Sequence, residues 1–324
     1  MLEKEKILVL GGSGFIGTNL LKKLKEKGFK NLYATSYSKK KFFKVNKVKY
    51  QKLNALNKKD VDNITKGKNI LFILSANSSG AAVMEKEPLV HLNPNLRMNM
   101  NILESAYKNN IRKVIFVSSN TVYPNSNHKM KEKDVNYSFF HKYHIVGWMK
   151  TFSEVLCEIY AKKIKNPIKS IIVVRPSNLY GSFDKFSYQK SKVIAATIRK
   201  FEENKDVIKV WGDGEDIKDF IYIDDFCEAL IKVSKTNPKF ETINICSGKS
   251  IKLKKIINYC ANIYKFDKRN IKYDTTMPSM IPKRYMSNLR LVRKYNFKEK
   301  FDIFNGLKNT IKWYKKNKKV YNNF

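Results

Sequence analysis

The feature that most constrains this chain is a short apolar segment that runs directly into a glycine-rich turn. The strand pattern of Ile7–Leu10 is followed by Gly12-Ser13-Gly14-Phe15-Ile16-Gly17 and then by apolar residues at helical spacing as far as Gly28. In this context Gly-x-Gly-x-x-Gly is the motif that binds a dinucleotide. The first glycine permits the tight turn, Gly14 lets the backbone approach the pyrophosphate, and Gly17 allows close packing of a helix whose N-terminus offers N–H groups.

We therefore expect the turn to hold NADP(H) or NAD(H), with phosphate contacts from Gly11, Ser13, Gly14, Phe15, Ile16 and Gly17. An acidic residue about 20 positions further on would accept the ribose hydroxyls of NAD. This chain has Ser36, Ser38 and Lys39 in that region and no carboxylate. The absence favours NADP(H), but lysines occur throughout the chain, so NAD(H) stays open.

Strand and helix patterns continue to alternate beyond the turn. Strand patterns at 32–35, 70–74, 114–117 and 170–174 alternate with helical patterns around 95–107 and 147–162. Such alternation predicts right-handed βαβ units, and hence an α/β fold with a doubly wound parallel Rossmann sheet.

After Gly181 the pattern loosens, with a helix near 192–201, short strands at 208–211 and 220–223, and further helices toward the C-terminus. We predict a dinucleotide-binding Rossmann domain over residues 1–180 with a return segment at 215–247. Residues 181–214 and 248–324 would form a smaller, interleaved C-terminal lobe that binds substrate.

The composition limits the class of protein. No apolar segment approaches the roughly 18–20 residues that span a bilayer, and the N-terminus is too polar for a secretory signal, so we expect a cytoplasmic protein without stable membrane insertion. Cys157, Cys227, Cys246 and Cys260 are widely spaced, which favours buried thiols and no metal site. The net charge of +37 in 324 residues is spread along the chain. We therefore expect no nucleic-acid partner, although the basic stretch at 312–319 keeps that alternative open.

From these glycines onward, the chain resembles the NAD(P)-dependent epimerase/dehydratase family of extended short-chain dehydrogenases/reductases. The resemblance is carried by the asparagine-bearing helix start at 95–103, the serine segment 117–123, Arg-Pro-Ser-Asn-Leu-Tyr-Gly at 175–181, and the segments 211–214 and 219–225. The motifs are nearest to those of the GDP-fucose synthase group. The resemblance implies hydride transfer at a ring carbon of a nucleoside-diphosphate sugar, commonly C4, and further cofactor contacts from Asn54, Ala76 and Pro176.

The resemblance also implies a catalytic serine, tyrosine and lysine, of which one is absent. Ser119 matches the hydroxyl that binds the reacting oxygen, and Lys150 matches the lysine that holds the nicotinamide ribose. Four residues before Lys150, where the family has its proton-transferring tyrosine, stands Val146. Valine cannot exchange a proton. Either another group transfers the proton, or the protein has lost the usual chemistry of the family. Tyr143 is a candidate catalytic residue, although two helical turns would put it about 10 Å from Lys150, and a packing role is the alternative.

The remaining candidates would contact substrate. They are Ser119, Thr121, Asn178, Lys192, Lys218 and Arg284, where Lys192 replaces a histidine acid and Lys218 the usual arginine. Arg284 matches a late diphosphate-binding arginine, and a surface role is the alternative. The resemblance implies a homodimer through the helices near 95–107 and 147–162. A second hypothesis is a non-catalytic regulatory or scaffold protein that keeps the dinucleotide site.

Overall fold

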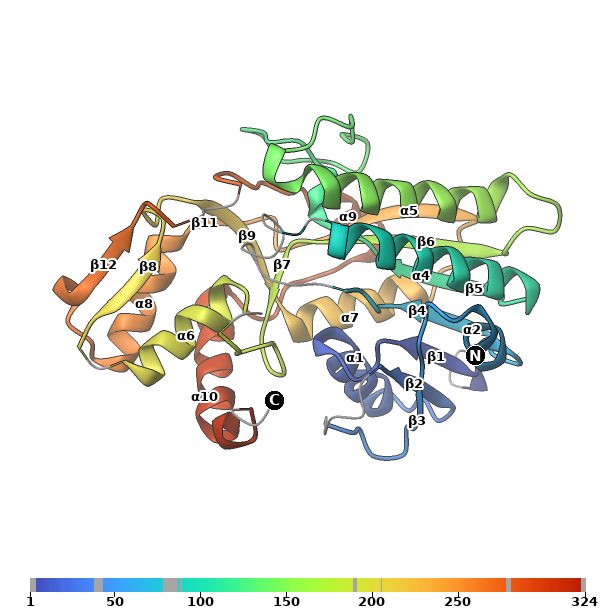
Figure 1. The fold of residues 1–324 in the computed structure, drawn as a ribbon, viewed down its shortest axis with the longest axis horizontal. Coiled ribbons are helices and arrows are strands. Elements are labelled where there is room, and N and C mark those ends of the chain that lie inside the picture. The colour runs from blue at the N-terminus through green and yellow to red at the C-terminus, as the bar shows by residue number, and fades with distance from the viewer. Residues whose placement is uncertain are drawn as a thin grey trace.

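The computed structural model describes residues 4–37, 43–77, 87, 89–188, 191–204, 206–277 and 281–321. Figure 1 shows an α/β region on the right, which contains the N-terminal half of the chain, and a smaller region on the left. The segment from 178 to 222 leads from the first region into the second.

The larger region is built on a seven-stranded sheet in the order β10-β6-β5-β4-β1-β2-β3. Every pair of neighbours is parallel. The strands are β1 (Ile7–Leu10), β2 (Leu32–Ser36), β3 (Lys49–Lys52), β4 (Ile70–Ile73), β5 (Lys113–Val117), β6 (Ser170–Pro176) and β10 (Phe240–Ile245). The order reverses direction at β1, as in a doubly wound sheet. The predicted Rossmann fold is confirmed.

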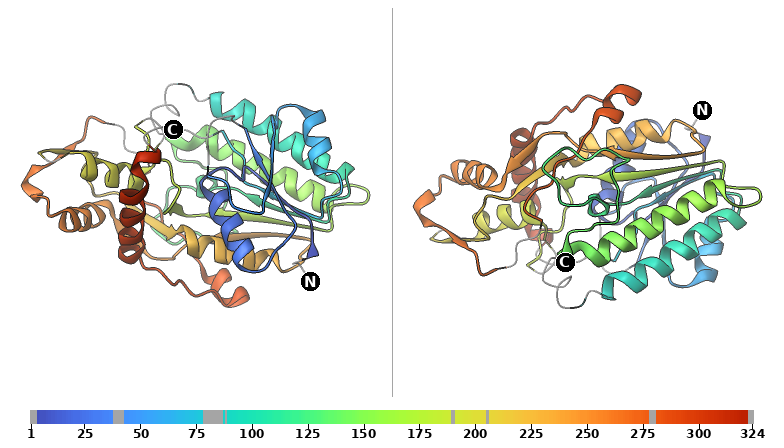
Figure 2. Two further views of the ribbon diagram at one scale, coloured as in Figure 1. Left: turned by 90° about the horizontal axis from the view of Figure 1, so that it is seen from below. Right: turned by 90° about the horizontal axis from the view of Figure 1, so that it is seen from above.

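Helices cover both faces of this sheet. On one face lie α2 (Lys58–Thr65), α4 (Leu89–Lys108) and α5 (His144–Lys162), and on the other α1 (Phe15–Glu26), α7 (Ile223–Ser234) and α9 (Leu289–Tyr295). Figure 2 shows α4 and α5 side by side along one flank of the molecule. Because both faces are covered, β1, β4 and β5 are buried along their whole length.

Strand β3 was not expected from the sequence, and helix α4 begins earlier than expected. Strand β3 has the sequence KYQK and lies at the exposed edge of the sheet, so it lacks an apolar pattern. Helix α4 starts six residues earlier than predicted and contains Pro94. Proline has no N–H to donate to Val90 O, and the Asn77 Nδ2 donates to that carbonyl instead at 3.0 Å.

The smaller region contains two further sheets. Strand β9 (Ile217–Tyr222) lies between β7 (Asn178–Tyr180) and β11 (Ser250–Lys252), and β8 (Ile208–Trp211) pairs with β12 (Ile271–Asp274). Helices α6 (Val193–Glu203), α8 (Leu253–Tyr264) and α10 (Ile303–Tyr321) pack beside them. After β9, which belongs to the three-stranded sheet, the chain returns to the larger region. There α7 packs on the seven-stranded sheet and β10 is one of its strands.

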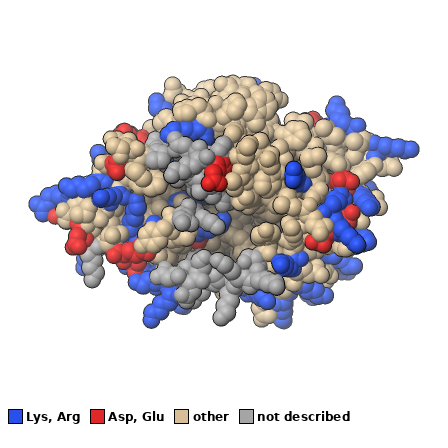
Figure 3. Space-filling model, viewed as in Figure 1, with Lys and Arg blue, Asp and Glu red and all other residues tan. Residues whose placement is uncertain are grey.

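Lysine and arginine side chains lie mostly toward both ends of the face in Figure 3, with carboxylates among them. Within the described ranges, no helix has the length and apolar character needed to cross a bilayer.

Candidate functional site

The turn between β1 and α1 has the geometry of a phosphate cradle. Gly11 has a φ of +81°, a backbone conformation that is favourable only for glycine, and its N–H donates to Thr35 Oγ1 at 2.9 Å. The sequence predicted the tight turn at Gly12, which lies in the turn, but the positive φ belongs to Gly11. A Cβ at Gly12 would lie 2.6 Å from Ala34 Cβ, so Gly12 serves close packing against β2.

Gly17 lets α1 approach the turn. A Cβ at this position would lie 2.3 Å from Gly11 O and 2.6 Å from Gly12 Cα. The first N–H groups of α1, which have no partner within the helix, are therefore held directly beside the turn. Helix α1 has no side-chain cap and no acidic residue in its first turn. The cradle thus fits an anionic dinucleotide.

The other predicted cofactor residues lie at or beyond the carboxyl ends of neighbouring strands. Ser36 ends β2, Pro176 ends β6, and Asn54 and Ala76 follow β3 and β4. In parallel sheets these ends share one edge, which is where ligands bind. Ser38 and Lys39 fall outside the described residues.

Lys150 and the serine segment meet at the carboxyl end of β5. Lys150 Nζ donates to Val117 O at 3.2 Å and lies 5.1 Å from the centre of the Phe116 ring. Burial lowers the pKa of Lys150 to about 8. Ser119 Oγ accepts the Thr121 N–H at 3.1 Å at the start of a short 3-10 helix, and Thr121 Oγ1 is buried with no partner among the described residues.

Glycine also controls how α5 meets this segment. A Cβ at Gly147 would lie 2.6 Å from the Phe139 ring and 3.1 Å from Thr121 O, so α5 can approach the serine segment only because position 147 has no side chain. This contact puts Ser119, Thr121 and Lys150 in one neighbourhood, as the sequence predicted.

Tyr143 immediately precedes α5, and Val146 lies within its first turn. Burial raises the pKa of Tyr143, and the charges of Arg284 and Asp216 act on it in opposite directions. The phenol is therefore within electrostatic range of residues in the smaller region.

A buried polar network lies beneath the serine segment, and the sequence analysis did not anticipate it. Ser118 Oγ donates to Glu154, which Arg175 grips through Nε at 3.1 Å and Nη2 at 2.5 Å. Arg175 Nη1 donates to Tyr123 Oη at 3.0 Å and Glu132 O at 2.8 Å. The available signal was Glu154 itself, a carboxylate one turn after Lys150 on the same helix.

Arg284 is the clearest feature on the substrate side. The residue is 2% exposed, and its Nη1 donates to Tyr123 O at 3.0 Å and Pro124 O at 3.2 Å. Its Nε and Nη2 have no partner among the described residues, and burial lowers its pKa to about 10. Unpaired buried donors on a cation suit an anionic ligand.

Lys218 and Asn178 already have partners. Lys218 Nζ donates to Asp216 Oδ2 at 2.5 Å and Ile281 O at 3.2 Å. Asn178 Nδ2 donates to Asp219 O at 2.8 Å. Either could reach a ligand only by giving up or sharing these bonds.

Lys192 is exposed and precedes α6. Its positive charge lowers the pKa values of Lys150 and Asp184, so its ammonium group lies within electrostatic range of both. Burial raises the pKa of Asp184 to about 6, and its Oδ2 has no partner in the described part of the chain.

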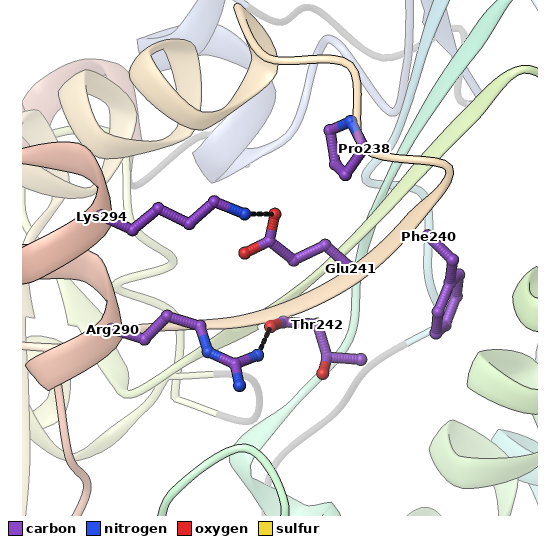
Figure 4. A pocket seen from close by; sticks show the side chains of 6 residues that line it. All are labelled: Pro238, Phe240, Glu241, Thr242, Arg290 and Lys294. Carbon is purple, nitrogen blue, oxygen red and sulfur yellow. Dashed lines mark hydrogen bonds and ion pairs between the residues drawn. The ribbon is translucent and has the colours of Figure 1, made fainter.

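The pocket in Figure 4 lies elsewhere. It has a volume of about 460 Å³ and is lined by Pro238, Phe240, Glu241, Thr242, Arg290 and Lys294. These residues include the amino end of β10, the opposite edge of the sheet from the glycine turn. Its cations have partners, since Lys294 Nζ lies 2.6 Å from Glu241 Oε2 and Arg290 Nη1 donates to Thr242 O at 3.0 Å.

The described residues contain no cluster of three or more His, Cys, Asp or Glu side chains suited to a metal ion. All four cysteines are buried free thiols, as their apolar surroundings suggested.

Comparison with known proteins identifies the family to which the chain is similar. The model of the NAD dependent epimerase/dehydratase family matches residues 7–246. GDP-L-fucose synthase 1 of Arabidopsis thaliana is 25% identical, over 96% of this chain and 94% of the relative. GDP-L-colitose synthase of Yersinia pseudotuberculosis is 26% identical, over 95% of this chain and 97% of the relative.

A solved UDP-glucose 4-epimerase of Thermotoga maritima, in a structure with UDP-glucose, has the same fold. It aligns with a TM-score of 0.85 over 96% of this chain and 99% of its own, at 22% identity. The chain thus belongs to the NAD-dependent epimerase/dehydratase family of extended short-chain dehydrogenases/reductases, whose members are NAD(P)-dependent enzymes of nucleotide sugars.

Proposed function

We propose that the chain is a cytoplasmic oxidoreductase or epimerase that acts with NADP(H) or NAD(H) on a ring carbon, C4, of a GDP-linked sugar. The observation that carries this proposal is the pairing of a glycine cradle with a buried arginine. The cradle at Gly17 suits a dinucleotide, and Arg284 has unpaired donors for a second phosphate group. The names of the GDP-sugar relatives support the choice of GDP.

We assign residues 1–180 and 215–247 to the cofactor-binding domain, and 181–214 and 248–324 to the substrate lobe. Two observations support this for residues 223–245: α7 packs against α1, β6 and β10, and β10 is a strand of the large sheet. Strand β9 lies between β7 and β11 in the small sheet, so we move the start of the return segment from residue 215 to the end of β9, near residue 222.

The cofactor-side residues hold and orient the dinucleotide. The backbone of Gly11, Ser13, Gly14, Phe15, Ile16 and Gly17 would bind its phosphates, Ser36, Ser38, Lys39 and Asn54 its adenosine end, and Ala76 and Pro176 the remainder. The Lys150 ammonium would donate to the nicotinamide ribose. The bound nicotinamide would exchange a hydride with the sugar carbon.

The substrate-side residues hold the sugar nucleotide. Arg284 would bind the diphosphate through Nε and Nη2, the two atoms that lack partners. Asn178, Lys192 and Lys218 would contact the nucleotide or the sugar. Ser119 and Thr121 would donate hydrogen bonds to the reacting oxygen, which fits the buried, unpartnered Thr121 Oγ1.

The proton must move through a group other than Val146. Tyr143, Tyr123, Thr121 and Lys192 are the candidates. Lys192 is supported as the proton donor because its charge acts on Lys150. Tyr143 is supported because it is buried and the charge of Arg284 acts on it. General acid–base help of this kind is worth about 10²- to 10⁴-fold in rate.

A homodimer is the third part of the proposal. One side of α5 exposes Trp148 (45%), Phe152 (44%), Val155 (42%) and Ile159 (37%), which follow a spacing of one helical turn. An apolar stripe of this length on a surface helix is typical of an interface, and a second copy related by two-fold symmetry would cover it.

The alternative is a non-catalytic regulatory or scaffold protein, and Val146 is the observation that favours it. The test of both is to mix the protein with GDP-sugars and other sugar nucleotides and follow nicotinamide absorbance. A substrate-dependent redox change supports the enzyme. Cofactor binding without any change would favour the alternative.

A further inference from the structure

Glu154 is a buried carboxylate to which no role in the site has yet been assigned. It is 6% exposed and lies one helical turn after Lys150, on the same helix. Residues four apart on a helix are neighbours on its surface. Glu154 is thus close to the ammonium group to which the nicotinamide ribose is assigned.

We propose that Glu154 is a positioning residue of the nicotinamide site, where it keeps the Lys150 ammonium charged and holds the serine segment in register with it. The proposal rests on the proposed function in one respect, namely that Lys150 binds the cofactor. It is carried by the hydrogen bonds that link Glu154 to Ser118 and Arg175.

Glu154 is one of the charged groups that act on Lys150. In the described part of the chain, the Lys150 ammonium group donates one hydrogen bond, to Val117 O, and lies over the Phe116 ring, so little of its hydration is replaced. The ionisable groups that act on it are Glu154 and Cys157 from its own helix and Lys192 from the start of α6. Cys157 is a buried thiol whose pKa is raised by burial, so it stays neutral. Glu154 therefore provides the negative charge that opposes both burial and Lys192.

Hydrogen bonds from Arg175 and Ser118 hold the Glu154 carboxylate in place. Arg175 binds both oxygens of Glu154, through Nε at 3.1 and 3.2 Å and Nη2 at 2.5 Å. This grip fixes the carboxylate, because two parallel bonds define its orientation. Ser118 Oγ donates to the same carboxylate, and Ser118 precedes the proposed catalytic Ser119. The carboxylate thus ties the serine segment to the helix that carries Lys150.

The network also extends to the substrate side. Arg175 Nη1 binds Tyr123 Oη, and the Tyr123 carbonyl accepts from Arg284 Nη1. Tyr123 Oη in turn donates to Asn244 Oδ1 at 2.6 Å. Glu154 is therefore the end of a continuous set of contacts that begins at the proposed diphosphate-binding arginine.

The test is the pH dependence of cofactor affinity, measured by titrating NADPH and NADH and following nicotinamide fluorescence. Burial lowers the pKa of Lys150 to about 8, so affinity that needs the ammonium is present below that pH and lost above it. Glu154→Gln removes the opposing charge, and we expect the alkaline loss of affinity to move to lower pH by about one unit, because a nearby opposite charge stabilises the ammonium form. A purely structural role would weaken binding equally at every pH.

The matched control is Glu158→Gln, one turn further along α5, where the exposed carboxylate pairs with Lys162 at 2.9 Å. It should leave the pH profile unchanged. If Glu154→Gln does not fold, Glu154→Gln combined with Arg175→Met removes both buried charges of the pair, and a shift in the same direction is expected, smaller than in the single variant because a neighbouring cation is lost with the carboxylate. An unmoved profile in these variants, or an equal shift in Glu158→Gln, overturns the proposal.

Lys150→Met separates this proposal from the function on which it rests. This variant should abolish the loss of cofactor affinity at alkaline pH. If Lys150→Met retains the wild-type affinity and profile, then Lys150 does not bind the ribose, and both the role of Lys150 and that of Glu154 are wrong. If Lys150→Met loses the profile but Glu154→Gln keeps it, only the role of Glu154 is wrong.

Discussion

Replacing Gly17 with alanine tests the cradle directly. The added methyl group would lie 2.3 Å from Gly11 O and 2.6 Å from Gly12 Cα, against roughly 3.5 Å for a relaxed contact. Both neighbours are backbone atoms in a turn that Thr35 holds in place, so α1 must move away by about 1 Å. Overpacking of this kind costs about 1–3 kcal/mol, which corresponds to roughly 5- to 150-fold in an equilibrium constant.

The effect on the cofactor should exceed the effect on folding. Displacing the start of α1 separates its N–H groups from the pyrophosphate, so Gly17→Ala should weaken NADPH or NADH binding at least tenfold. Fluorescence titration gives the affinity and thermal unfolding gives the stability. Gly306→Ala is the control, because its methyl group would lie 2.1 Å from Tyr180 Oη in the smaller region and should lower stability without changing cofactor affinity. Wild-type cofactor affinity in a folded Gly17→Ala variant would refute the cradle.

Three further outcomes are expected. Arg284→Gln removes the guanidinium with two unpaired donors and should raise the dissociation constant of GDP about 10- to 100-fold by calorimetry, while cofactor affinity is retained; an equal loss of both would contradict the assignment. Val146→Tyr should lower turnover, because the proposed proton donor lies elsewhere; a gain approaching about 100-fold would instead indicate a degraded site. Trp148→Asp combined with Phe152→Asp places charges on the apolar stripe of α5 and should give monomers in sedimentation velocity, and an unchanged mass would argue against the dimer.

Much of the fold could be predicted because its strands are buried on both faces. The sequences of β1, β4 and residues 114–117 of β5 are continuous and apolar, and the glycines between β1 and α1 have few other uses. Strand β3 escaped prediction because an edge strand exposes both faces and needs no apolar pattern. The start of α4 escaped it because the tertiary contact from Asn77 compensates for Pro94.

The site was predictable where one residue type has one chemical use. Gly17 is such a case, whereas Lys150 could be singled out only from the family resemblance, because lysines occur throughout the chain. The distinction between Gly11 and Gly12 depends on a φ value and on Ala34 across the turn, which sequence spacing does not contain. Likewise, the pairing of Glu154 with Arg175 joins helix α5 to strand β6, and only the packed fold brings them together.

The most direct measurement is calorimetric titration of the purified protein with each of the four nicotinamide dinucleotides. The account predicts saturable binding of at least one form at one site per chain, and loss of that binding in Gly17→Ala. If none of the four is taken up and none co-purifies with the protein, the dinucleotide site does not exist, and neither the enzyme nor the regulatory alternative can be correct.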